Sequence, residues 1–536
     1  MPLLHPQNSL VVGCLVLLGV VAAGLALAAP NSSGADARAA ADRSKQPNIV
    51  LIQADDQTLR QFTQVVMPKT TRLMVDHGTE FTNYLATTGQ CCPSRATLLT
   101  GQYAHNHGIT SNNVGYRGLH RKQNVLPVWL RHAGYRTMHV GGKYVNGYPA
   151  YADPPVRVAP GWEQWFTAYS PTHYYDYKLS VNGYHEFRGH RPDDYIGRVL
   201  AKKASHLIDT YGPLRRPFYL QLDTLAPHVA EQDDPWGECD RKAIPDPRDE
   251  GRFDGAALPD PPSFDERDMA DKPSFLASAP PLNEVYTQKL LAKWRCALAS
   301  LSQVDRSVAK LFTAVKRAGE MSNTVFVFVS DNGLFYGEHR IRSGKVFPYE
   351  EAVHLPFLMR VPRRYREGAS RVPDVGKLVG NIDIAPTILD LARAKPCRPH
   401  HGCRAMDGRS VMPLLTGSGD WPEDRGLLAE FREPDLPRYS TCEFAGIRTR
   451  DEIYVEHYRV VNPSTGRCVD HIPPAVELYN LSSDPFQLDN QCYGGSTDNC
   501  RHDEAQADLD RRLAKLRQCI GIRGRDERMD GRPFCE

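Results

Sequence analysis

The sequence predicts an α/β protein, with a large, mostly parallel sheet sandwiched between helices and a smaller α+β domain at the C-terminal end. Short apolar segments that suit buried parallel strands alternate with segments that suit helices. Residues 284–318 carry Leu, Val and Trp at three- and four-residue steps, as in a helix packed on a sheet. After residue 394 the sequence changes to cysteines, turns and short predicted strands.

The strands are expected to deliver polar groups at one edge of the sheet. Strands are predicted at 48–54, 138–140, 218–223 and 324–330, and helices at 68–77, 93–99, 126–132, 284–318 and 503–518. The first strand stops on Asp55-Asp56 and the last on Asp331-Asn332. Because chemistry in such folds gathers at the carboxyl ends of the strands, these acidic pairs are candidate site residues.

Length and charge restrict the function classes. A chain of 536 residues can bury a large core, and we expect a catalytic domain at 47–394 and a Cys-rich domain at 395–536. Lys and Arg total 65 against 63 for Asp and Glu, which argues against nucleic acid or an anionic membrane as the main partner. The Pro- and Asp-rich residues 227–281 show little periodicity and predict a long surface excursion.

The first residues predict export. An uncharged run over 10–29 ends in small residues, which predicts a signal peptide at 1–29, a disordered linker at 30–46 and a secreted, periplasmic or lysosomal-type protein. The run is also about long enough to span a membrane, so an uncleaved anchor is the alternative. Without Cys14, Cys91 and Cys92, ten of the 13 cysteines remain, enough for five disulfides of undetermined pairing. No cysteine spacing typical of structural zinc is present.

Residues 89–101, GQCCPSRATLLTG, form the most informative motif. Pro93 suits the first turn of a helix, which places Cys91 just before the helix. Free amides and the helix dipole at that end attract an anion, and Arg95 adds a planar donor for a tetrahedral oxyanion. The motif therefore predicts a sulfate or phosphate site. The alternative is a vicinal cysteine pair that only packs or forms a disulfide.

This motif, followed by Thr100-Gly101, resembles the C-x-P-S-R signature of the sulfatase family. In that family a separate formylglycine-generating enzyme oxidises the first cysteine to formylglycine. The resemblance covers about residues 47–490 and implies an alkaline phosphatase-like fold. It also implies that Cys91 is the aldehyde precursor, that Cys92 is a variable neighbour, and that Arg95 belongs to the finished site.

The resemblance implies two further groups of site residues. The calcium ligands would be Asp55, Asp56, Cys91, Asp331 and Asn332. The sulfate-binding and leaving-group residues would be Arg95, Lys143, His228 and Lys345. Hard oxygen donors suit Ca²⁺, with Mg²⁺ as the alternative. Each residue also has a simpler explanation, because acidic pairs often cap helices and basic residues often lie in solvated loops.

Four segments are most similar to N-acetylglucosamine-6-sulfatases and extracellular heparan sulfate 6-O-endosulfatases, which implies a sulfated carbohydrate or aryl sulfate substrate. They read GKYVNGY, YYDYKLSVNG, SDNGLFYGEHR and ELYNLSSDP. Aromatic residues expected near the rim either contact the sugar or pack the loop; they are Trp162, Trp165, Tyr174 and Tyr175. The chain departs from the common Lys-x-His pattern because Asn146 stands in the region after Lys143. Residues 134–143 are one residue longer than usual, which would fit a β-bulge.

The mechanism implied by the resemblance uses the hydrated aldehyde of residue 91 to attack sulfur. Arg95, Lys143 and Lys345 would hold the sulfuryl group, and His228 would protonate the leaving alcohol. The second hydroxyl of the hydrate would then expel sulfate and restore the aldehyde. Two alternatives stay open: a phosphonate or phosphodiester hydrolase of the same superfamily, and a calcium-dependent binder of sulfated glycans without turnover.

Overall fold

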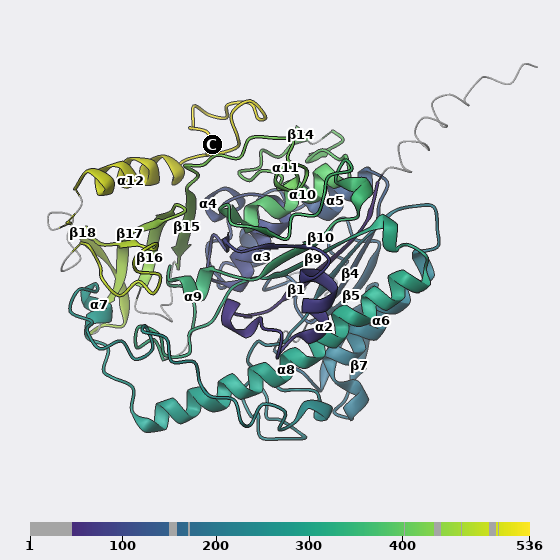
Figure 1. Ribbon diagram of the computed structural model, residues 1–536, viewed down its shortest axis with the longest axis horizontal. Helices are drawn as coiled ribbons and strands as arrows, with labels where there is room; N and C mark the ends of the chain where they lie inside the picture. Colours follow the sequence, from purple (N-terminus) through teal and green to yellow (C-terminus); the bar gives the residue numbers. More distant parts are fainter. Residues whose placement is uncertain are drawn as a thin grey trace, which may run out of the picture. The chain divides into compact units, whose positions relative to one another are not determined.

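A ten-stranded sheet forms the centre of the computed structural model, which describes residues 46–536 except 149–157, 170–171, 343, 401, 434–440, 463, 493–499 and 502 (Figure 1). In spatial order its strands are β11 (Asp374–Val375), β2 (Thr79–Phe81), β10 (Phe357–Arg360), β9 (Thr324–Ser330), β1 (Asn48–Ala54), β8 (Phe218–Asp223), β4 (Arg136–Gly141), β5 (Gln164–Ala168), β6 (Tyr177–Val181) and β7 (Tyr184–Arg188). The five central strands, β9 to β5, are parallel. Antiparallel pairs flank them on both sides. The predicted parallel sheet is therefore confirmed at its centre.

Helices cover both faces of this sheet. One face carries α3 (Cys91–Thr100), α5 (Leu126–His132) and α10 (Ile384–Leu391), and the other carries α6 (Ile196–Tyr211) and α8 (Glu284–Arg317). Because successive side chains of a strand point to opposite faces, Ile49 and Leu51 join the first core and Val50 and Ile52 join the second. The apolar strand sequences follow from burial on both sides.

The remaining elements are short. They are α2 (Pro68–Thr70), which continues as a π-helical turn (Thr71–Val75), α4 (Ala104–His107), α7 (Ser274–Ala277), α9 (Glu350–Val353), α11 (Met412–Thr416) and the two-residue strands β3 (Tyr84–Leu85), β12 (Val379–Gly380), β13 (Cys397–Arg398) and β14 (Gly402–Cys403). Within 227–281 the structure contains only α7 and one 3₁₀ turn, Pro247–Asp249. The expected irregular excursion is confirmed.

The C-terminal part forms a separate antiparallel sheet. Its strands are β15 (Leu427–Arg432), β16 (Thr441–Arg448), β17 (Glu452–Asn462) and β18 (Arg467–Asn480), and α12 (Asp503–Leu516) packs against them. The smaller α+β domain is therefore confirmed. The expectation of short strands is wrong for β17 and β18, because polar and charged residues interrupt the apolar segments of their long hairpin.

All ten remaining cysteines pair. The disulfides are Cys239–Cys296, Cys397–Cys403, Cys442–Cys468, Cys492–Cys500 and Cys519–Cys535. The first joins the irregular excursion to α8 across 57 residues of sequence.

Loop-closure entropy predicts that replacing both cysteines of the Cys239–Cys296 disulfide with Ser lowers the free energy of unfolding by about 4 kcal/mol. The same double replacement at Cys397 and Cys403, separated by 6 residues, should cost about 2 kcal/mol. Denaturant unfolding would measure both losses, and equal losses would contradict the prediction.

A partly buried histidine, His105, joins α4 to the C-terminal sheet. His105 Nδ1 lies 3.0 Å from Glu430 Oε1 of β15, and its Nε2 lies 3.0 Å from the Cys519 carbonyl oxygen. Burial lowers the pKa of His105, but the Glu430 carboxylate outweighs burial and raises this pKa to about 9. A raised folded-state pKa stabilises the fold fully below pH about 6.5, and this stabilisation is lost as the pH rises through about 9.

We therefore expect the free energy of unfolding to fall by about 1–3 kcal/mol between pH 6.5 and 9.5 because of this pair. The measurement is thermal unfolding of the wild type and of His105→Gln across that range. The variant should show a flatter pH dependence, and parallel curves would contradict the assignment.

The expected signal peptide and linker lie outside the described residues, apart from Gln46. Gln46 is buried, and its side-chain amide donates to the Ala392 carbonyl oxygen at 2.6 Å. In the described part of the chain, no helix is long and apolar enough to cross a membrane.

Candidate active site

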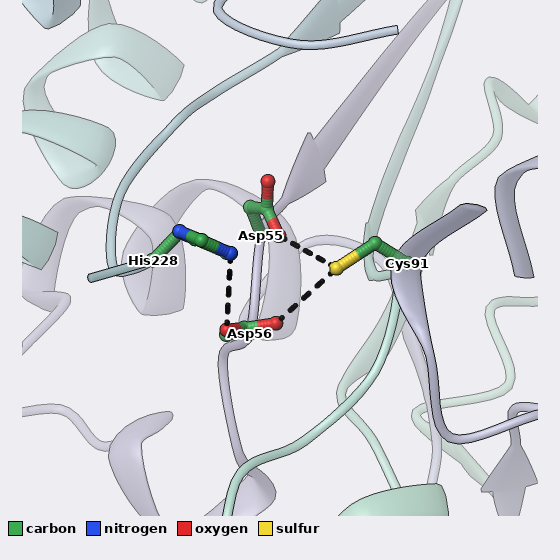
Figure 2. A group of neighbouring side chains, drawn as sticks. All are labelled: Asp55, Asp56, Cys91 and His228. Atoms are coloured by element: carbon green, nitrogen blue, oxygen red, sulfur yellow. Dashed lines mark hydrogen bonds and ion pairs between the residues drawn. The ribbon is translucent and has the colours of Figure 1, made fainter. Parts of the chain in front are cut away.

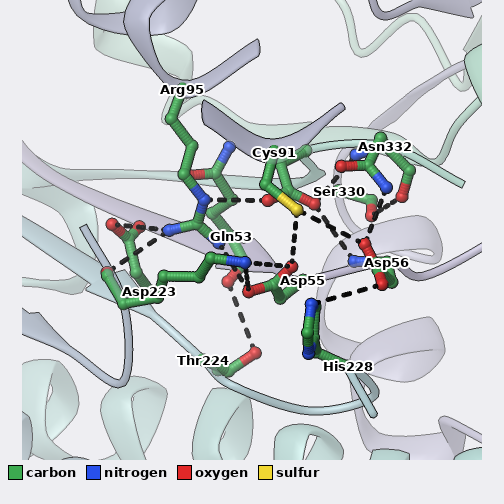
Figure 3. Close-up of polar contacts among 12 residues, drawn as sticks. Gln53, Asp55, Asp56, Cys91, Arg95, Asp223, Thr224, His228, Ser330 and Asn332 are labelled. Atoms are coloured by element: carbon green, nitrogen blue, oxygen red, sulfur yellow. Dashed lines mark hydrogen bonds and ion pairs between the residues drawn. The ribbon is translucent and has the colours of Figure 1, made fainter. Parts of the chain in front are cut away.

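Four neighbouring parallel strands, β9, β1, β8 and β4, bring polar residues to one edge of the sheet (Figure 3). Asp55 and Asp56 follow β1, Asp331 and Asn332 follow β9, and Lys143 follows β4 after one glycine. The backbone amide of Asp56 donates to Asp331 Oδ1 at 3.0 Å, so the two acidic pairs are in direct contact. The prediction that these strand ends meet is confirmed.

Cys91 is the first residue of α3, and not the residue before the helix as the sequence indicated. Cys91 and Cys92, the two residues before Pro93, are already helical, because proline is tolerated throughout the first turn of a helix. The backbone amide of Cys92 donates to Asn112 Oδ1 at 2.9 Å, so one of the amides expected to attract an anion already has a partner. Both cysteines are free thiols, and Cys92 packs in the apolar core while Cys91 does not. The vicinal disulfide is therefore wrong.

The Cys91 thiol lies in a cluster of charged groups (Figure 2). Its Sγ is 3.4 Å from Asp55 Oδ1, 3.6 Å from Asp56 Oδ1 and 2.8 Å from Lys345 Nζ. Potential ligand atoms of Asp55, Asp56, Cys91 and His228 all lie within 4.8 Å of one another. Residues from three separate parts of the chain thus surround the first cysteine of the motif.

Arg95 lies one helical turn after Cys91 and faces three carboxylates. Its Nε is 2.8 Å from Asp331 Oδ2, its Nη2 is 3.4 Å from Asp55 Oδ2, and its Nη1 is 3.4 Å from Asp223 Oδ2. The Arg95 side chain is only 2% exposed. Its planar fork therefore holds carboxylates from three adjacent strands in fixed positions.

Asp223 and His139 are two site residues that the sequence analysis missed. His139 Nε2 lies 3.0 Å from Asp223 Oδ2, and its Nδ1 lies 2.6 Å from Thr167 Oγ1. Both residues are almost fully buried. The available signal was that β8, like β1 and β9, runs directly into an acidic residue.

Asp223→Asn should therefore weaken the support of Arg95. We expect kcat/KM on a sulfate ester to fall about 10–100-fold, the range seen when groups that orient site residues are replaced. We expect the free energy of unfolding to fall by about 1–3 kcal/mol, because the change disturbs a buried charged network. Asp305→Asn is the matched control, since Asp305 is a buried carboxylate that binds Thr70 elsewhere. Equal kcat/KM losses in both variants would contradict the positioning role.

Lys143, Lys345 and His228 also lie at this edge. Lys143 Nζ is 3.1 Å from Asp55 Oδ2, Lys345 forms a short contact with Asp56, and His228 Nε2 is 3.8 Å from Asp56 Oδ2. Both lysines are buried, so the reading of either as a solvated surface charge is wrong. The bulge considered before Lys143 is also wrong, because β4 pairs with β5 and β8 without a register shift.

Two non-glycine residues in this region have positive φ angles. Asp56 has φ 71° and Val346 has φ 103°. A β-branched residue rarely adopts such a conformation, so the fold must impose it. Val346 forms a bridge with Gly89, two residues before Cys91, and this bridge holds the neighbouring Lys345 beside the thiol.

The cluster is close to electrically balanced. Its described charged residues are the carboxylates Asp55, Asp56, Asp223 and Asp331 and the cations Arg95, Lys143 and Lys345. Burial alone would raise the pKa of Asp55 and of Asp56, but the neighbouring lysines lower both. Burial, and then the charge of Asp55, raises the pKa of Asp331 to about 6. Burial also raises the pKa of the Cys91 thiol and lowers that of His228.

The donor atoms fit a hard divalent cation. In the described part of the chain, the buried Asp55 Oδ2 and Asn332 Oδ1 accept no hydrogen bond, although cationic nitrogens lie near Asp55 Oδ2. Buried oxygens of this kind normally have a partner. Carboxylate and amide oxygens are the ligands that Ca²⁺ and Mg²⁺ prefer.

The four aromatic residues expected near the rim are buried and pack the fold. They are Trp162, Trp165, Tyr174 and Tyr175, each at most 3% exposed. Trp165 stacks on His139 with ring centroids 4.8 Å apart. Trp162 also packs against His139, and Tyr174 and Tyr175 pack against Tyr195. The packing alternative is therefore correct.

Comparisons with known proteins agree with the motif. A family model described as Sulfatase matches residues 47–394, and a model described as N-sulphoglucosamine sulphohydrolase, C-terminal, matches residues 337–519. This chain belongs to the sulfatase family. The chain is 30% identical to N-acetylglucosamine-6-sulfatase of Capra hircus, with 90% of this chain and 85% of the relative covered.

Two relatives of this chain are much longer than the region that matches. This chain is 33% identical to a Sulf-1 homolog of Caenorhabditis elegans over 69% of its own length. It is 31% identical to the extracellular sulfatase SULF-1 homolog of Drosophila melanogaster over 79% of its own length. The matches span only 49% and 36% of these relatives. Proteins named as N-acetylglucosamine-6-sulfatase and as extracellular sulfatase are thus both found among the relatives of this chain.

Solved structures confirm the fold. A protein in complex with its substrate D-glucosamine-2-N,6-O-disulfate superposes with TM-score 0.67 and 22% identity, over 88% of this sulfatase and 97% of that chain. The phosphonate monoester hydrolase of Agrobacterium radiobacter superposes with TM-score 0.62 and 20% identity, over 88% and 95%. The alkaline phosphatase-like α/β architecture is shared by both, so the fold alone does not choose between sulfur and phosphorus substrates.

Proposed function

We propose that this protein hydrolyses sulfate esters of a sulfated sugar such as N-acetylglucosamine 6-sulfate. The observation that carries the proposal is the position of Cys91, the first residue of the C-x-P-S-R motif, among Asp55, Asp56 and Lys345. The relative from Capra hircus, covered over 85% of its length, is named for that substrate and supports the choice of sugar.

Two groups would complete the site. A formylglycine-generating enzyme would convert Cys91 during maturation, and the hydrated aldehyde would supply the nucleophilic hydroxyl. A Ca²⁺ ion, or Mg²⁺, would be held by Asp55, Asp56, Asp331, Asn332 and residue 91. Such a dication lowers the pKa of a hydroxyl bound to it and neutralises anionic oxygens.

The chain's own residues would bind and orient the ester. Lys345 Nζ, 2.8 Å from Cys91 Sγ, and the buried Lys143 would donate to the sulfuryl oxygens. His228 Nδ1 lies 2.7 Å from the Val229 carbonyl oxygen, so the neutral ring carries its proton on Nδ1. To protonate the leaving alcohol, Nε2 would first have to take up a second proton; burial opposes this cationic form, and the carboxylates of Asp55 and Asp56 favour it. The motif alone implied that Arg95 binds the sulfuryl group. Because Arg95 faces three carboxylates, we instead assign it the role of positioning these carboxylates.

Charge favours a monoanionic substrate. The described site has four carboxylates and three cations, so a bound dication leaves one excess positive charge. One sulfate ester balances that charge, whereas a phosphate monoester dianion overcompensates it. A phosphonate monoester is also monoanionic, so the charge count does not separate it from a sulfate ester.

The deciding experiment compares hydrolysis of an aryl sulfate, an aryl phosphate, a phosphonate monoester and N-acetylglucosamine 6-sulfate by one preparation. Mass spectrometry of the peptide containing residue 91 accompanies it, because conversion of thiol to aldehyde removes about 18 Da. We expect the modified protein to prefer the sulfates. Faster phosphonate hydrolysis would favour the rival hydrolase, and binding of sulfated glycans without turnover would favour the binder.

We further propose that the protein is exported, with residues 47–394 as the catalytic domain and 395–536 as the C-terminal domain. The five disulfides support an oxidising compartment. The N-terminal apolar run supports a cleaved signal peptide, and membrane attachment would follow only if that run were retained.

A further inference from the structure

A basic groove of about 710 Å³ lies outside the site, against α6, α8 and the end of β7. Eight Lys and Arg side chains line it, against two Asp. Figure 1 shows α6 and α8 running beside each other on the same face of the sheet, and the Arg317–Asp209 ion pair joins them. Since the whole chain carries a formal charge of only +2, this groove concentrates positive charge locally.

The cations of the groove lie in rows. Arg198 and Lys202 are four residues apart along α6, and Arg306 and Lys310 are also four residues apart on α8. Residues at this spacing project from one face of a helix. Cationic side chains of two neighbouring helices therefore line the same groove.

Buried carboxylates fix some of these cations. Arg198, Arg248 and Arg306 all contact Asp246, which is 0% exposed, and Arg306 also pairs with Asp249. With Asp246, Asp249 and Glu186 counted, the groove still has an excess of three positive charges. The guanidinium groups are thus held in place by anions on their buried side.

Three lysines of the groove lack such partners. In the described part of the chain, no ion pair joins Lys202, Lys203 or Lys310 to a carboxylate. Lys202 and Lys310 are exposed, whereas Lys203 lies over the Phe166 ring at 4.3 Å. Unpaired ammonium groups beside anchored guanidinium groups suit a ligand with several anionic groups along its length.

Two tyrosine contacts link the helix that lines the groove to His228 of the site. Tyr174 donates its hydroxyl proton to the His228 carbonyl oxygen at 2.7 Å, and its ring stacks on Tyr195 with centroids 5.8 Å apart. Tyr195 is the N-cap of α6, which carries the first cationic row. The half-exposed Trp236 donates its indole N–H to the carbonyl oxygen of His190, the residue before the groove residue Arg191.

We propose that this groove binds a stretch of sulfated polysaccharide outside the catalytic pocket. The proposal rests on the proposed function, because a sulfatase acting on polymers would meet several sulfate groups at once. Rows of fixed cations match repeated sulfates, and the exposed Trp236 offers a flat face for a sugar ring. The five disulfides favour this partner over nucleic acid, which is concentrated in reducing compartments.

The test measures binding of heparin to the full chain by titration at several salt concentrations. The groove variant is Lys202→Glu with Lys310→Glu. The matched control is Lys395→Glu with Lys515→Glu, which has the same charge change at exposed lysines elsewhere. We expect Kd for heparin in 0.15 M salt to rise about 10–100-fold in the groove variant only, and its salt dependence to weaken by about two released ions or more. If the charge reversal lowers Tm, Lys202→Ser with Lys310→Ser replaces it and should show the same direction.

Several outcomes would overturn the proposal. Equal weakening in the groove and control variants would show a general charge effect. Equally tight binding of desulfated heparin would exclude sulfate recognition. Equally tight binding of duplex DNA would indicate a nucleic-acid surface. Saturation of the groove by inorganic sulfate at the same ionic strength would indicate a small-anion site. Because this assay needs no turnover, it is run also with Cys91→Ser, and aryl sulfate hydrolysis by the wild type separately tests the proposed function.

Discussion

Cys91→Ser should lose multiple turnover of every sulfate ester while keeping the fold. Serine cannot become formylglycine by oxidation of a thiol, and a serine hydroxyl has no second hydroxyl with which to expel sulfate. We expect kcat to fall by about 10⁴-fold or more, which corresponds to about 5 kcal/mol of lost transition-state stabilisation. Steady-state and single-turnover assays on an aryl sulfate would measure it, with at most one sulfate retained per chain.

The neighbouring cysteine provides the control. Cys92 is also buried and free, but it packs in the apolar core and its backbone amide binds Asn112. Cys92→Ala should therefore lose some stability through the cavity, typically about 1 kcal/mol, and keep both the aldehyde at residue 91 and its turnover. Sustained turnover by Cys91→Ser, or inactivity of a correctly modified Cys92→Ala, would contradict the assignment of the nucleophile.

Asp56→Asn should remove the response to calcium. Asp56 contacts Lys345, accepts from Asn332 Nδ2 at 2.7 Å and lies beside the Cys91 thiol, so its charge is central to the cluster. Loss of one carboxylate weakens a dication site built from few charges. We expect wild-type protein to gain about 3 kcal/mol of stability when Ca²⁺ is at 100 times its Kd, and the variant to gain almost none. Activity should fall about 10³-fold or more.

Thermal unfolding with and without a chelator would measure this effect, and equilibrium dialysis with Ca²⁺ gives a second readout that does not depend on activity. Asp305→Asn is again the control, because it neutralises a buried carboxylate that binds Thr70 far from Cys91 in the sequence. That variant should be destabilised and keep its calcium response. An undiminished calcium response in Asp56→Asn would place the ion elsewhere.

Much of the architecture could be predicted because burial leaves a clear mark on sequence. β1 and β9 are buried at every position, and α8 packs one face on the sheet, so their apolar patterns were unambiguous. The long hairpin β17–β18 was expected as short strands because polar residues interrupt its apolar segments and the first half of β18 is largely exposed. The pairing of the cysteines depended on three-dimensional proximity, which spacing alone does not specify.

The sequence predicted some residues of the candidate site and missed others, depending on whether local sequence reveals their position. Asp55, Asp56, Asp331 and Asn332 stand directly after strands, where local sequence reveals their position. Asp223 carried the same signal and was overlooked, whereas His139 lies inside β4 and looks like an ordinary strand residue. Its role becomes visible only when β8 lies beside β4 and places Asp223 at 3.0 Å.

By itself, the sequence determined the class of fold, the modification motif at Cys91 and the residue types gathered around it, because these depend on local pattern and on chemistry written into short segments. Only the tertiary structure decided that Arg95 faces carboxylates from three strands, that the aromatic residues are buried in the fold, and that cations from α6, α8 and β7 share one groove. Those features depend on which distant segments become neighbours when both faces of the sheet are buried, and no local pattern encodes that adjacency.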